Sequence, residues 1–364
     1  MPRLLMTTDA VGGVWTYALE LARALAPHDL AVTLATMGPQ PSADQVDAAQ
    51  TIPGLRLETS SFRLEWMSDA WADVDGAAEW LLDLEADVRP VVVHLNGYAH
   101  GALPWRSPRI IVGHSCVLSW RDAVGGTFTA SWLDEYRARV SRGLASADWV
   151  VAPTAAMLSA LRRHYGPLPR ASVIANARDG GLFRPGTKEP FVFAAGRLWD
   201  RAKNVDALAR VARDLSWEVV LAGASDRDFA GQANVTQLGR LTEAQMADWL
   251  QRASIVALPA RYEPFGLVAL EAALSGCALV LGDIPSLRDV WGDAASYVDP
   301  DDDRMLHDAI EALIADPSAL RASANRARQR ALAYSARRMA RLYRGVYDCA
   351  CGRHPVDRSL RCAS

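Results

Sequence analysis

The fourteen residues from Glu263 to Gly276, EPFGLVALEAALSG, decide the fold of this chain more than any other stretch of its sequence. They follow the apolar run Ser254–Ala260, which predicts a buried strand. From Leu267 onward the apolar spacing predicts a helix that packs on a sheet. We expect Pro264 to lie in the first turn of this helix and Gly266 to keep its start open. The segment therefore predicts one strand–loop–helix unit of an α/β protein.

The start of that helix has the properties of an anion site. The first turn of a helix exposes unpaired backbone N–H groups at the positive end of the helix dipole. Glu263 would lie at the mouth of the site, and Glu271 about two turns along the helix. Two carboxylates beside such a site suit a ligand with both phosphate and hydroxyl groups, such as a sugar nucleotide. Spacing alone leaves open that both are solvated residues of an ordinary helix.

Length and composition limit the class of protein. The 364 residues, half of them apolar, are enough for two domains that each bury a core. A net charge of −3 argues against a nucleic-acid binder that depends on bulk positive charge. Five scattered cysteines fit a reducing compartment, and the spacing of Cys349, Cys351 and His354 is wrong for a zinc finger. With no visible signal peptide and no apolar run of membrane-spanning length, we expect a cytoplasmic protein.

Short β-rich runs alternate with helical patterns along the chain. The expected strands are Leu4–Thr8, Leu30–Thr33, Val91–Leu95, Arg109–Gly113, Trp149–Ala152, Phe191–Ala195, Glu218–Ala222, Ser254–Leu258, Ala278–Gly282 and Ser296–Val298. The expected helices are Trp15–Leu25, Val205–Asp214, Glu243–Arg252, Leu267–Ser275 and Arg304–Ala315. This alternation predicts two doubly wound parallel sheets, with Asn176–Pro190 as the linker. The arginine-rich pattern near Ala336–Tyr347 predicts a last helix that crosses back onto the first domain.

Open α/β sheets bind ligands beyond the carboxyl ends of their strands, so the loops that follow strands carry the candidate residues. Gly12 and Gly13 end the first strand and open an amphipathic helix, where a ligand can approach the backbone. They do not form the dinucleotide-binding fingerprint, and plain tight turns also use such a pair.

Two further loops carry polar candidates. In the stretch AAGRLWDRAKN, Gly196 and Arg197 follow a strand and Lys203 opens the next helix. Two cations beside a helix start can hold a diphosphate without a metal, although they can also be surface residues. His114 follows an apolar strand, where it can bond a substrate hydroxyl or simply pack. His94 and Asn96 end the neighbouring strand and are expected to line the same cleft with less support.

Taken in order, the motifs GGV, VVVHLNG, VGH, SADWVVAPTAAM, AAGRL with KN, VLAG, LGRL and EPFGLVALEAALSG resemble those of the family-four retaining glycosyltransferases with the GT-B fold. The resemblance covers nearly the whole chain. It implies two Rossmann-like doubly wound parallel-sheet domains that face each other across a cleft. Residues 1–175 would bind the acceptor and residues 176–335 the nucleotide-sugar donor, with the helix at about 336–364 crossing back to the first domain.

The resemblance also implies roles for single residues. The catalytic set would be His114, Arg197, Lys203 and Glu263. Arg197 and Lys203 would bind the donor diphosphate, Glu263 the transferred sugar, Glu271 the ribose, and His114 the sugar near its reacting carbon. The further donor-binding residues would be Gly12, Gly13, Gly196, Arg240, Leu241, Phe265, Gly266, Leu267 and Val268, with Gly239 to Leu241 beside the nucleobase.

The sequence departs from the family pattern in two loops, and a further stretch bears on metal use. After the glycine pair this chain has Val14 and Trp15, where many relatives carry a small residue and Glu, a difference on the acceptor side. The family usually has IPNGVD where this chain has IANARD, so Arg178 is unusual and is expected to project toward the cleft. The Asp301–Asp303 run looks like a metal-binding Asp-x-Asp element, but capping of a helix start explains it better. We therefore expect no metal and no other cofactor.

The acceptor side is less defined. Aromatic rings can stack on sugars, and six tryptophans fall in the first domain: Trp66, Trp71, Trp80, Trp105, Trp120 and Trp132. Most are expected to pack in the core, while Trp66–Asp83 is expected to form a mobile acceptor flap. The final stretch favours contact with an anionic membrane face, or a solvated helix face, through Arg337, Arg338, Arg341, Arg344, Arg353, Arg358 and Arg361.

The leading hypothesis is thus a metal-independent retaining glycosyltransferase that moves a hexose-type sugar from a nucleoside diphosphate sugar to a carbohydrate, lipid-linked or small-molecule acceptor. One alternative is a sugar-nucleotide epimerase or hydrolase on the same scaffold. Another is a non-catalytic subunit that binds sugar nucleotides. No nucleic-acid partner is expected, and the enzyme would work in the cytoplasm or at the inner face of the membrane.

Overall fold

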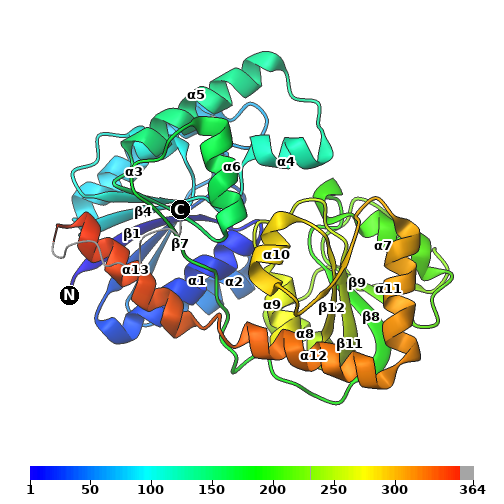
Figure 1. Ribbon diagram of the computed structural model, residues 1–364. Helices are drawn as coiled ribbons and strands as arrows, with labels where there is room; N and C mark the ends of the chain where they lie inside the picture. Colours follow the sequence, from blue (N-terminus) through cyan, green and yellow to red (C-terminus); the bar gives the residue numbers. More distant parts are fainter. Residues whose placement is uncertain (230, 353–364) are drawn as a thin grey trace. The chain divides into compact units, whose positions relative to one another are not determined.

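The computed structural model describes residues 1–229 and 231–352 (Figure 1). Their contacts divide the chain into two compact units. Unit 1 contains residues 1–121, 126–176 and the described residues from 336 onward, and unit 2 contains residues 122–125 and 177–335. Each unit has a parallel sheet covered by helices, which confirms the predicted α/β class with doubly wound parallel sheets.

The sheet of unit 1 has seven parallel strands in the order β3-β2-β1-β4-β5-β6-β7. Apolar side chains fill the central strands because both faces of the sheet are covered. The strands are β1 (Arg3–Asp9), β2 (Ala31–Met37), β3 (Leu55–Thr59), β4 (Val92–Leu95), β5 (Arg109–Val112), β6 (Trp149–Ala152) and β7 (Ala171–Val173).

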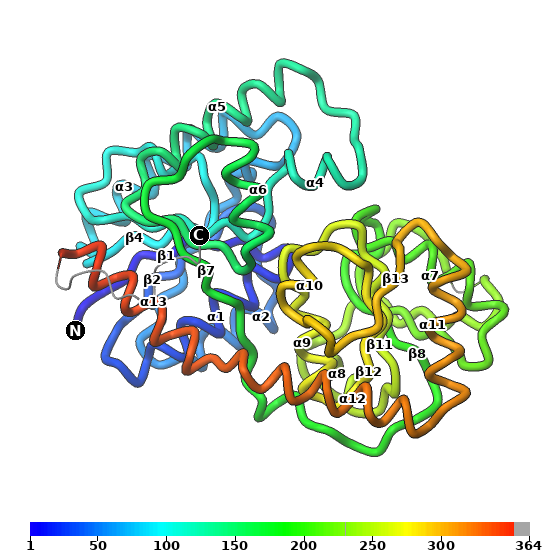
Figure 2. Tube along the Cα trace, viewed as in Figure 1, coloured from blue at the N-terminus to red at the C-terminus, as the bar shows by residue number. Residues whose placement is uncertain are grey.

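Helices cover both faces of this sheet (Figure 1). One face carries α1 (Gly13–Leu25), α2 (Ala43–Gln50) and α13 (Ala336–Ala350), and the other carries α3 (Trp71–Val88), α5 (Ala130–Ser146) and α6 (Ala155–Tyr165). Shorter helices are η1 (Ala26–His28), η2 (Ala99–Ala102) and α4 (Val117–Val124). Figure 2 shows α13, from the C-terminal end of the chain, beside α1 near the N-terminus. The part of the predicted last helix beyond residue 352 lies outside the described residues.

Unit 2 has six parallel strands in the order β10-β9-β8-β11-β12-β13. They are β8 (Glu189–Ala195), β9 (Glu218–Ala222), β10 (Val235–Gln237), β11 (Ala253–Leu258), β12 (Ala278–Gly282) and β13 (Ser296–Val298). One face of the sheet carries α7 (Val205–Ala212) and α11 (Asp303–Ala315) (Figure 1). The opposite face carries α8 (Glu243–Arg252), α9 (Leu267–Leu274) and α12 (Pro317–Ala331), and α10 (Pro285–Trp291) joins β12 to β13.

Both sheets reverse their strand order next to their first strand. In unit 1 the reversal lies between β1 and β4, and in unit 2 between β8 and β11. At such a point the chain leaves two adjacent strands toward opposite faces, which opens a crevice at their carboxyl ends. The fold therefore places the loops that follow β1, β4, β8 and β11 where an α/β sheet binds its ligand.

Several predicted elements match the structure in their bounds, among them Glu218–Ala222, Glu243–Arg252 and Ala278–Gly282. The edge strands β3, β7 and β10 were not predicted. They are short, and partly exposed residues interrupt their apolar pattern.

Two expectations are wrong. From Trp71 onward the predicted flap is helix α3, whose Val74, Ala77 and Leu81 are buried in the core. Pro264 does not lie in the first turn of α9, because that helix begins at Leu267.

Candidate active site

Two loops of unit 2 are joined at the reversal of strand order. One follows β8 and spans residues 196–204, and the other follows β11 and spans residues 259–266. The backbone N–H of Arg261 donates to the carbonyl of Ala202 at 2.9 Å. This bond between backbones holds the two loops at a fixed separation.

Asn204 joins the same loops through its side chain. Its φ of 54° lies in the left-handed region, which asparagine tolerates better than most residues. The buried amide donates to the carbonyls of Pro259 at 2.9 Å and Pro300 at 2.7 Å, and its Oδ1 accepts from the Arg261 guanidinium. One side chain therefore connects the loops that follow β8, β11 and β13. The sequence placed Asn204 at a helix start but did not reveal these contacts.

The predicted cations and one predicted carboxylate lie on these loops. Lys203 Nζ lies 2.5 Å from Glu263 Oε2, and their side chains are 20% and 19% exposed. Arg197 Nη2 lies 2.8 Å from Asp200 Oδ2, and 39% of the Arg197 side chain is exposed. Each cation is thus held by a carboxylate, while the Arg197 guanidinium remains accessible from solvent. Asp200, which orients Arg197, was not recognised in the sequence.

The charge state of Glu263 follows from its surroundings. Burial raises the pKa of the Glu263 carboxyl. The Lys203 ammonium, the Phe265 N–H and the Arg197 guanidinium lower this pKa, and together they lower it by more than burial raises it. The net pKa is therefore below the ordinary value for glutamate, and Glu263 is ionised at neutral pH. Its Oε1 also accepts from the Gly266 N–H at 3.0 Å. This ionised carboxylate suits a hydrogen-bond acceptor for hydroxyl groups.

The start of α9 offers fewer backbone donors than the sequence predicted. Gly266 is the N-cap residue with a φ of 87°, a left-handed conformation that glycine adopts without strain. The N–H groups of Phe265 and Gly266 face Glu263 Oε1 at 3.5 and 3.0 Å, so they already have an acceptor. Leu267 and Val268 belong to the first helical turn, where N–H groups have no partner within the helix. Of the predicted backbone donors, Leu267 and Val268 are therefore the two whose N–H groups do not face Glu263, and the roles of all four residues stay predictions.

Glu271 lies further along α9 and is only 7% exposed. Arg178 Nε lies 2.8 Å from Glu271 Oε1, and its Nη2 bonds to Glu243. The Arg178 guanidinium also lies 4.8 Å from the centre of the Phe183 ring. The expectation that Arg178 projects toward the cleft is wrong, because its side chain is 3% exposed and holds the Glu271 carboxylate inside unit 2.

Close approach of glycines brings residues 239–241, the predicted nucleobase segment, beside the loop of residues 196–204 that carries Arg197 and Lys203 (the cation loop). A Cβ atom on Gly223, at the end of β9, would lie 1.7 Å from the carbonyl oxygen of Gly196. The Gly223 N–H donates to the carbonyl of Gly239 at 2.7 Å. Arg240 is exposed and Leu241 is partly buried. The roles predicted for Gly196 and for residues 239–241 stay predictions.

Unit 1 places its own candidates around its reversal of strand order. Gly12 is the N-cap residue of α1, which begins at Gly13. His114 follows β5, and its Nε2 lies 2.9 Å from Asn96 Oδ1. His94 has no exposed surface, so the expectation that it lines a cleft is wrong. Burial lowers the pKa of both His94 and His114 to about 3, so both rings are neutral at physiological pH.

Two stretches of the sequence bear on metal use, the acidic run Asp301–Asp303 and the last cysteines, and metal independence stays a prediction. In the described part of the chain, no three His, Cys, Asp or Glu side chains lie together as a metal site. Asp302 caps α11 by accepting from the Met305 N–H at 2.9 Å, which confirms the predicted capping role of this acidic run. Cys349 and Cys351 are free thiols, and His354 lies outside the described residues.

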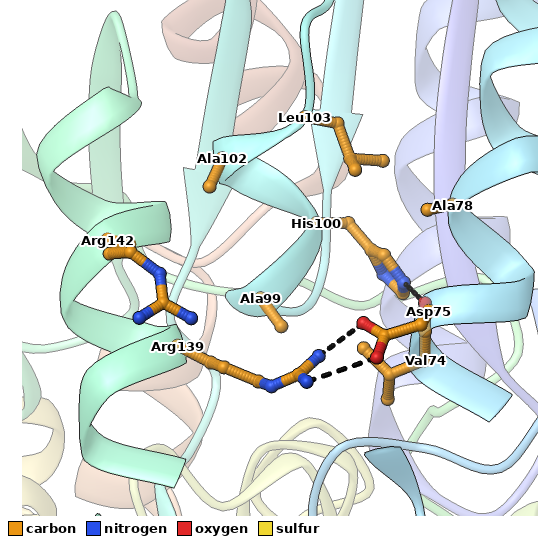
Figure 3. A pocket seen from close by; sticks show the side chains of 9 residues that line it. All are labelled: Val74, Asp75, Ala78, Ala99, His100, Ala102, Leu103, Arg139 and Arg142. Atoms are coloured by element: carbon orange, nitrogen blue, oxygen red, sulfur yellow. Dashed lines mark hydrogen bonds and ion pairs between the residues drawn. The ribbon is translucent and has the colours of Figure 1, made fainter. Parts of the chain in front are cut away.

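Unit 1 also contains a cavity of about 160 Å³ lined by residues of α3, η2 and α5 (Figure 3). Arg139 extends toward it from α5 and is paired with Asp75 at 2.5 Å and with Glu135 at 2.6 Å. His100 lies on the other side and bonds the Val74 carbonyl through Nε2 at 2.9 Å. None of the predicted site residues lines this cavity, and its central cation already has two carboxylate partners.

Most of the six tryptophans pack against the core of unit 1, as predicted. Trp105 is 7% exposed, and Trp132 stacks on Phe128 and Tyr136 with ring centres 4.8 and 5.3 Å away. Trp66 is 37% exposed, and the partly exposed Trp120 packs edge-on against Phe128 with ring centres 6.3 Å apart. Stacking of an aromatic ring on an acceptor sugar therefore stays a prediction for Trp66 and Trp120.

Family models match both units. The model described as Glycosyltransferase Family 4 matches residues 11–179, within the sequence range of unit 1 and the start of unit 2. The model described as Glycosyl transferases group 1 matches residues 189–316 of unit 2. The second match includes Arg197, Lys203, Glu263 and Glu271.

Individual proteins match over most of the chain. A D-inositol 3-phosphate glycosyltransferase from Xylanimonas cellulosilytica is 30% identical over an alignment that covers 85% of this chain and 85% of that protein. Sucrose-phosphate synthase from Thermosynechococcus elongatus has a similar structure, with a TM-score of 0.79, 19% identity, and coverage of 96% and 100%. HepE from Anabaena, solved in complex with UDP-glucose, is similar with a TM-score of 0.78, 15% identity and the same coverage.

Proposed function

The chain belongs to the family 4 glycosyltransferases (glycosyl transferases group 1), and from this premise we propose its donor, stereochemistry and metal use. The proposed reaction moves a hexose-type sugar from a nucleoside diphosphate sugar to a carbohydrate, lipid-linked or small-molecule acceptor. It retains the anomeric configuration and uses no metal. The observation that carries this proposal is the grouping of Arg197, Lys203 and Glu263 where the strand order of unit 2 reverses.

The diphosphate would bind to the two cations and the start of α9. Arg197 offers a partly exposed planar guanidinium, which suits phosphate oxygens. Lys203 lies next to it in the same loop, and the first-turn N–H groups of Leu267 and Val268 add donors at the positive end of a helix dipole. Together these groups would replace the charge that a divalent metal supplies in other enzymes. Metal independence follows from this arrangement as part of the proposal.

The sugar and the nucleoside would bind to the carboxylates and to a neighbouring loop. Glu263, ionised and held by Lys203, would accept hydrogen bonds from hydroxyl groups of the transferred sugar. Glu271, held by Arg178, would do the same for the ribose. The backbone of residues 239–241 would contact the base, because Gly239 bonds to Gly223 beside the cation loop.

The proposed chemistry requires no protein nucleophile. The bond between the anomeric carbon and the diphosphate oxygen breaks, and the acceptor oxygen forms its bond to that carbon from the same face. The acceptor proton passes to the departing diphosphate oxygen, so the configuration is retained and charges balance. Arg197 and Lys203 stabilise the negative charge that grows on the leaving group. Glu263 takes part by position, since its ion pair with Lys203 makes it a weak nucleophile.

The relatives indicate which donors and acceptors to test first. HepE was solved with UDP-glucose, so uridine and glucose are the first base and sugar to try. The name of the relative from Xylanimonas gives D-inositol 3-phosphate as its substrate. Small phosphorylated polyols are therefore the first acceptors to test. We propose a UDP-hexose as the donor class.

Contact with an anionic membrane surface is part of the proposal for a lipid-linked acceptor. Helix α13 exposes Arg337, Arg338, Arg341 and Arg344, and each basic residue near such a surface contributes about 1 kcal/mol. Arg353, Arg358 and Arg361 lie outside the described residues. No helix in residues 1–229 and 231–352 has the length and hydropathy of a membrane-spanning segment. Co-sedimentation with anionic vesicles that disappears at high salt would support this contact, and equal binding to neutral vesicles would contradict it.

The main test uses the full chain and a panel of sugar nucleotides. Thermal unfolding with UDP-glucose, UDP-N-acetylglucosamine, GDP-mannose and ADP-glucose first identifies the donor, since a ligand at 100 times its Kd stabilises by about 2.7 kcal/mol. Transfer of labelled sugar to acceptors is then measured with and without a chelator, and the product anomer is determined by NMR. The expected result is a retained glycoside in both conditions. Free sugar, an epimerised donor, an inverted product or dependence on metal would each contradict the proposal.

A further inference from the structure

A continuous line of hydrogen-bonded side chains crosses the core of unit 1, from the C-terminal helix α13 to the predicted residue His114. Tyr347 Oη lies 2.8 Å from His94 Nδ1. His94 Nε2 lies 3.2 Å from both Asn96 Oδ1 and Tyr17 Oη. His114 Nε2 lies 2.9 Å from the same Asn96 oxygen. The proposed reaction so far gives no role to Asn96, His94 or Tyr347.

The backbone of β1 determines which way the Asn96 amide faces. Asn96 Nδ2 donates to the Thr7 carbonyl at 2.8 Å, and the Asn96 backbone N–H donates to Thr7 Oγ1 at 2.9 Å. A backbone carbonyl can only accept, so the NH₂ end of the amide must face Thr7. The amide oxygen therefore faces the two imidazole rings. Since Thr7 lies in β1 and Asn96 directly follows the adjacent parallel strand β4, the sheet itself holds this orientation.

The orientation of the amide in turn selects the tautomer of each histidine. An amide oxygen only accepts hydrogen bonds, so His114, whose Nε2 has this oxygen as its partner, must carry a proton on Nε2. We assign the same tautomer to His94, whose Nε2 faces this oxygen and the Tyr17 hydroxyl at the same 3.2 Å. Burial keeps both rings neutral, and a neutral imidazole carries one proton. His94 Nδ1 then accepts from the Tyr347 hydroxyl, which fits their 2.8 Å distance. His114 Nδ1 is left as a lone-pair acceptor.

The surroundings of His114 support this assignment. The residue keeps some exposed surface, and the Tyr17 ring packs against its imidazole edge-on with the centres 4.3 Å apart. The titratable groups around the two histidines are neutral tyrosines: Tyr17 of α1 and Tyr343 and Tyr347 of α13. No hydrogen-bond partner of His114 Nδ1 is found among the described residues. A bare imidazole nitrogen accepts from a hydroxyl group but cannot donate to a phosphate oxygen.

We propose that Asn96 is a positioning residue that locks His114 in the Nε2–H tautomer, so that Nδ1 accepts a hydrogen bond from a hydroxyl group of a sugar substrate. His94 and Tyr347 complete this line of hydrogen bonds, because His94 contacts the Asn96 oxygen from the other side and Tyr347 connects His94 to α13. This inference rests on the proposed function and adds to it a chemical selectivity. His114 would bind a sugar hydroxyl, and the phosphates would bind to Arg197 and Lys203.

The first experiment observes the tautomers directly and requires no activity. Full-length protein labelled with ¹⁵N-histidine gives separate nitrogen signals for protonated and bare ring nitrogens, assigned through His94→Gln and His114→Gln. We expect both rings to be neutral with the proton on Nε2 from pH 5.5 to 8. An Nδ1–H tautomer or a charged ring at His114 in the wild-type protein would overturn the inference, whatever reaction the enzyme catalyses.

The second experiment changes the acceptor at Asn96. In Asn96→Asp a carboxylate faces the two rings and favours a charged His114, which turns Nδ1 from an acceptor into a donor. We expect kcat/KM at pH 6 to fall at least tenfold and to recover as the pH rises toward 8. Tyr347→Phe is expected to lose roughly two- to fivefold. The matched control Ser172→Ala removes a buried bond to Trp149, 3.1 Å long, in the same unit and is expected to keep the wild-type pH profile.

Deoxy substrates identify the hydroxyl and its source. Donors and acceptors that each lack one sugar hydroxyl are compared in wild type and Asn96→Asp. We expect one of them to be poor for the wild type and to lose this disadvantage in the variant. If sugar transfer occurs but Asn96→Asp keeps the wild-type pH profile and the wild-type discrimination, the inference fails while the proposed function stands. If no sugar is transferred from any donor, the proposed function fails and the NMR result still decides the tautomer.

Discussion

The ion pair between Lys203 and Glu263 leads to the most quantitative prediction. Its atoms lie 2.5 Å apart, and each side chain is about one-fifth exposed, at 20% and 19%. At an effective dielectric constant of about 20, the attraction between two such charges is about 7 kcal/mol, most of which offsets their lost hydration. Exposed pairs contribute up to about 1 kcal/mol, and breaking a buried pair costs about 3–5 kcal/mol. We therefore expect a coupling free energy of about 2 kcal/mol for this pair.

A double-mutant cycle measures that coupling. Urea unfolding is measured for the wild type, Lys203→Met, Glu263→Gln and the double variant. The stability losses of the two single variants should add up to about 2 kcal/mol more than the loss in the double variant. The catalytic prediction is separate. Lys203→Met should lower kcat at saturating donor by about 100-fold or more, equivalent to about 3 kcal/mol, because a charge that stabilises the leaving group is lost. Coupled assays of released nucleoside diphosphate give this rate directly.

A neighbouring cation supplies the matched control for this prediction. Arg201 lies in the same short helix as Lys203 and is exposed, but it has no proposed contact with the donor. Arg201→Met should keep kcat within about twofold of the wild type. Normal turnover by Lys203→Met at saturating donor, or an equal loss in Arg201→Met, would refute the reasoning.

Three more outcomes follow from the structure. Gly223→Ala should destabilise the protein by about 3 kcal/mol in urea unfolding, because its Cβ would meet the Gly196 carbonyl at 1.7 Å; wild-type stability would contradict the close approach. Arg178→Met should weaken the preference for ribo- over 2′- and 3′-deoxyribonucleoside diphosphates in calorimetric binding, because it releases the Glu271 carboxylate; an unchanged preference would remove Glu271 from ribose binding. The pKa of buried His94 is lowered to about 3, as is that of His114, so the unfolded chain takes up these protons first and stability should decline from pH 6.5 toward pH 4. Each histidine should contribute up to about 1.4 kcal/mol per pH unit, so His94→Phe should make the decline less steep by that amount; an equally steep decline in the variant would contradict the pKa shift of His94.

The sequence predicted the central architecture of both units because buried parallel strands are continuous apolar runs. Trp149–Ala152 and Ala278–Gly282 are such runs, and both lie inside their sheets. The segment Trp66–Asp83 was predicted to be a mobile flap, although its Val74, Ala77 and Leu81 have the spacing of a buried helix face. The tryptophans of this segment favoured a sugar-binding interpretation over the periodicity of a buried helix.

The candidate site was predictable where one loop holds the residues and unpredictable where distant segments meet. Arg197 and Lys203 follow one strand, so their proximity follows from the chain itself. The pairing of Lys203 with Glu263 spans 60 positions, and that of His94 with Tyr347 spans 253. One sequence carries no record of such pairs. The hydrogen bond from Asn204 to Pro259 and the one from Asn96 to Thr7 also join segments that are far apart in the sequence.

A crystal structure of the full chain with a nucleoside diphosphate sugar tests the central claim most directly. The account predicts that the two phosphates lie within hydrogen-bond distance of the Arg197 guanidinium, the Lys203 ammonium and the N–H groups of Leu267 and Val268. A nucleotide bound at another place, with both cations still turned toward their carboxylates or toward solvent, would contradict it.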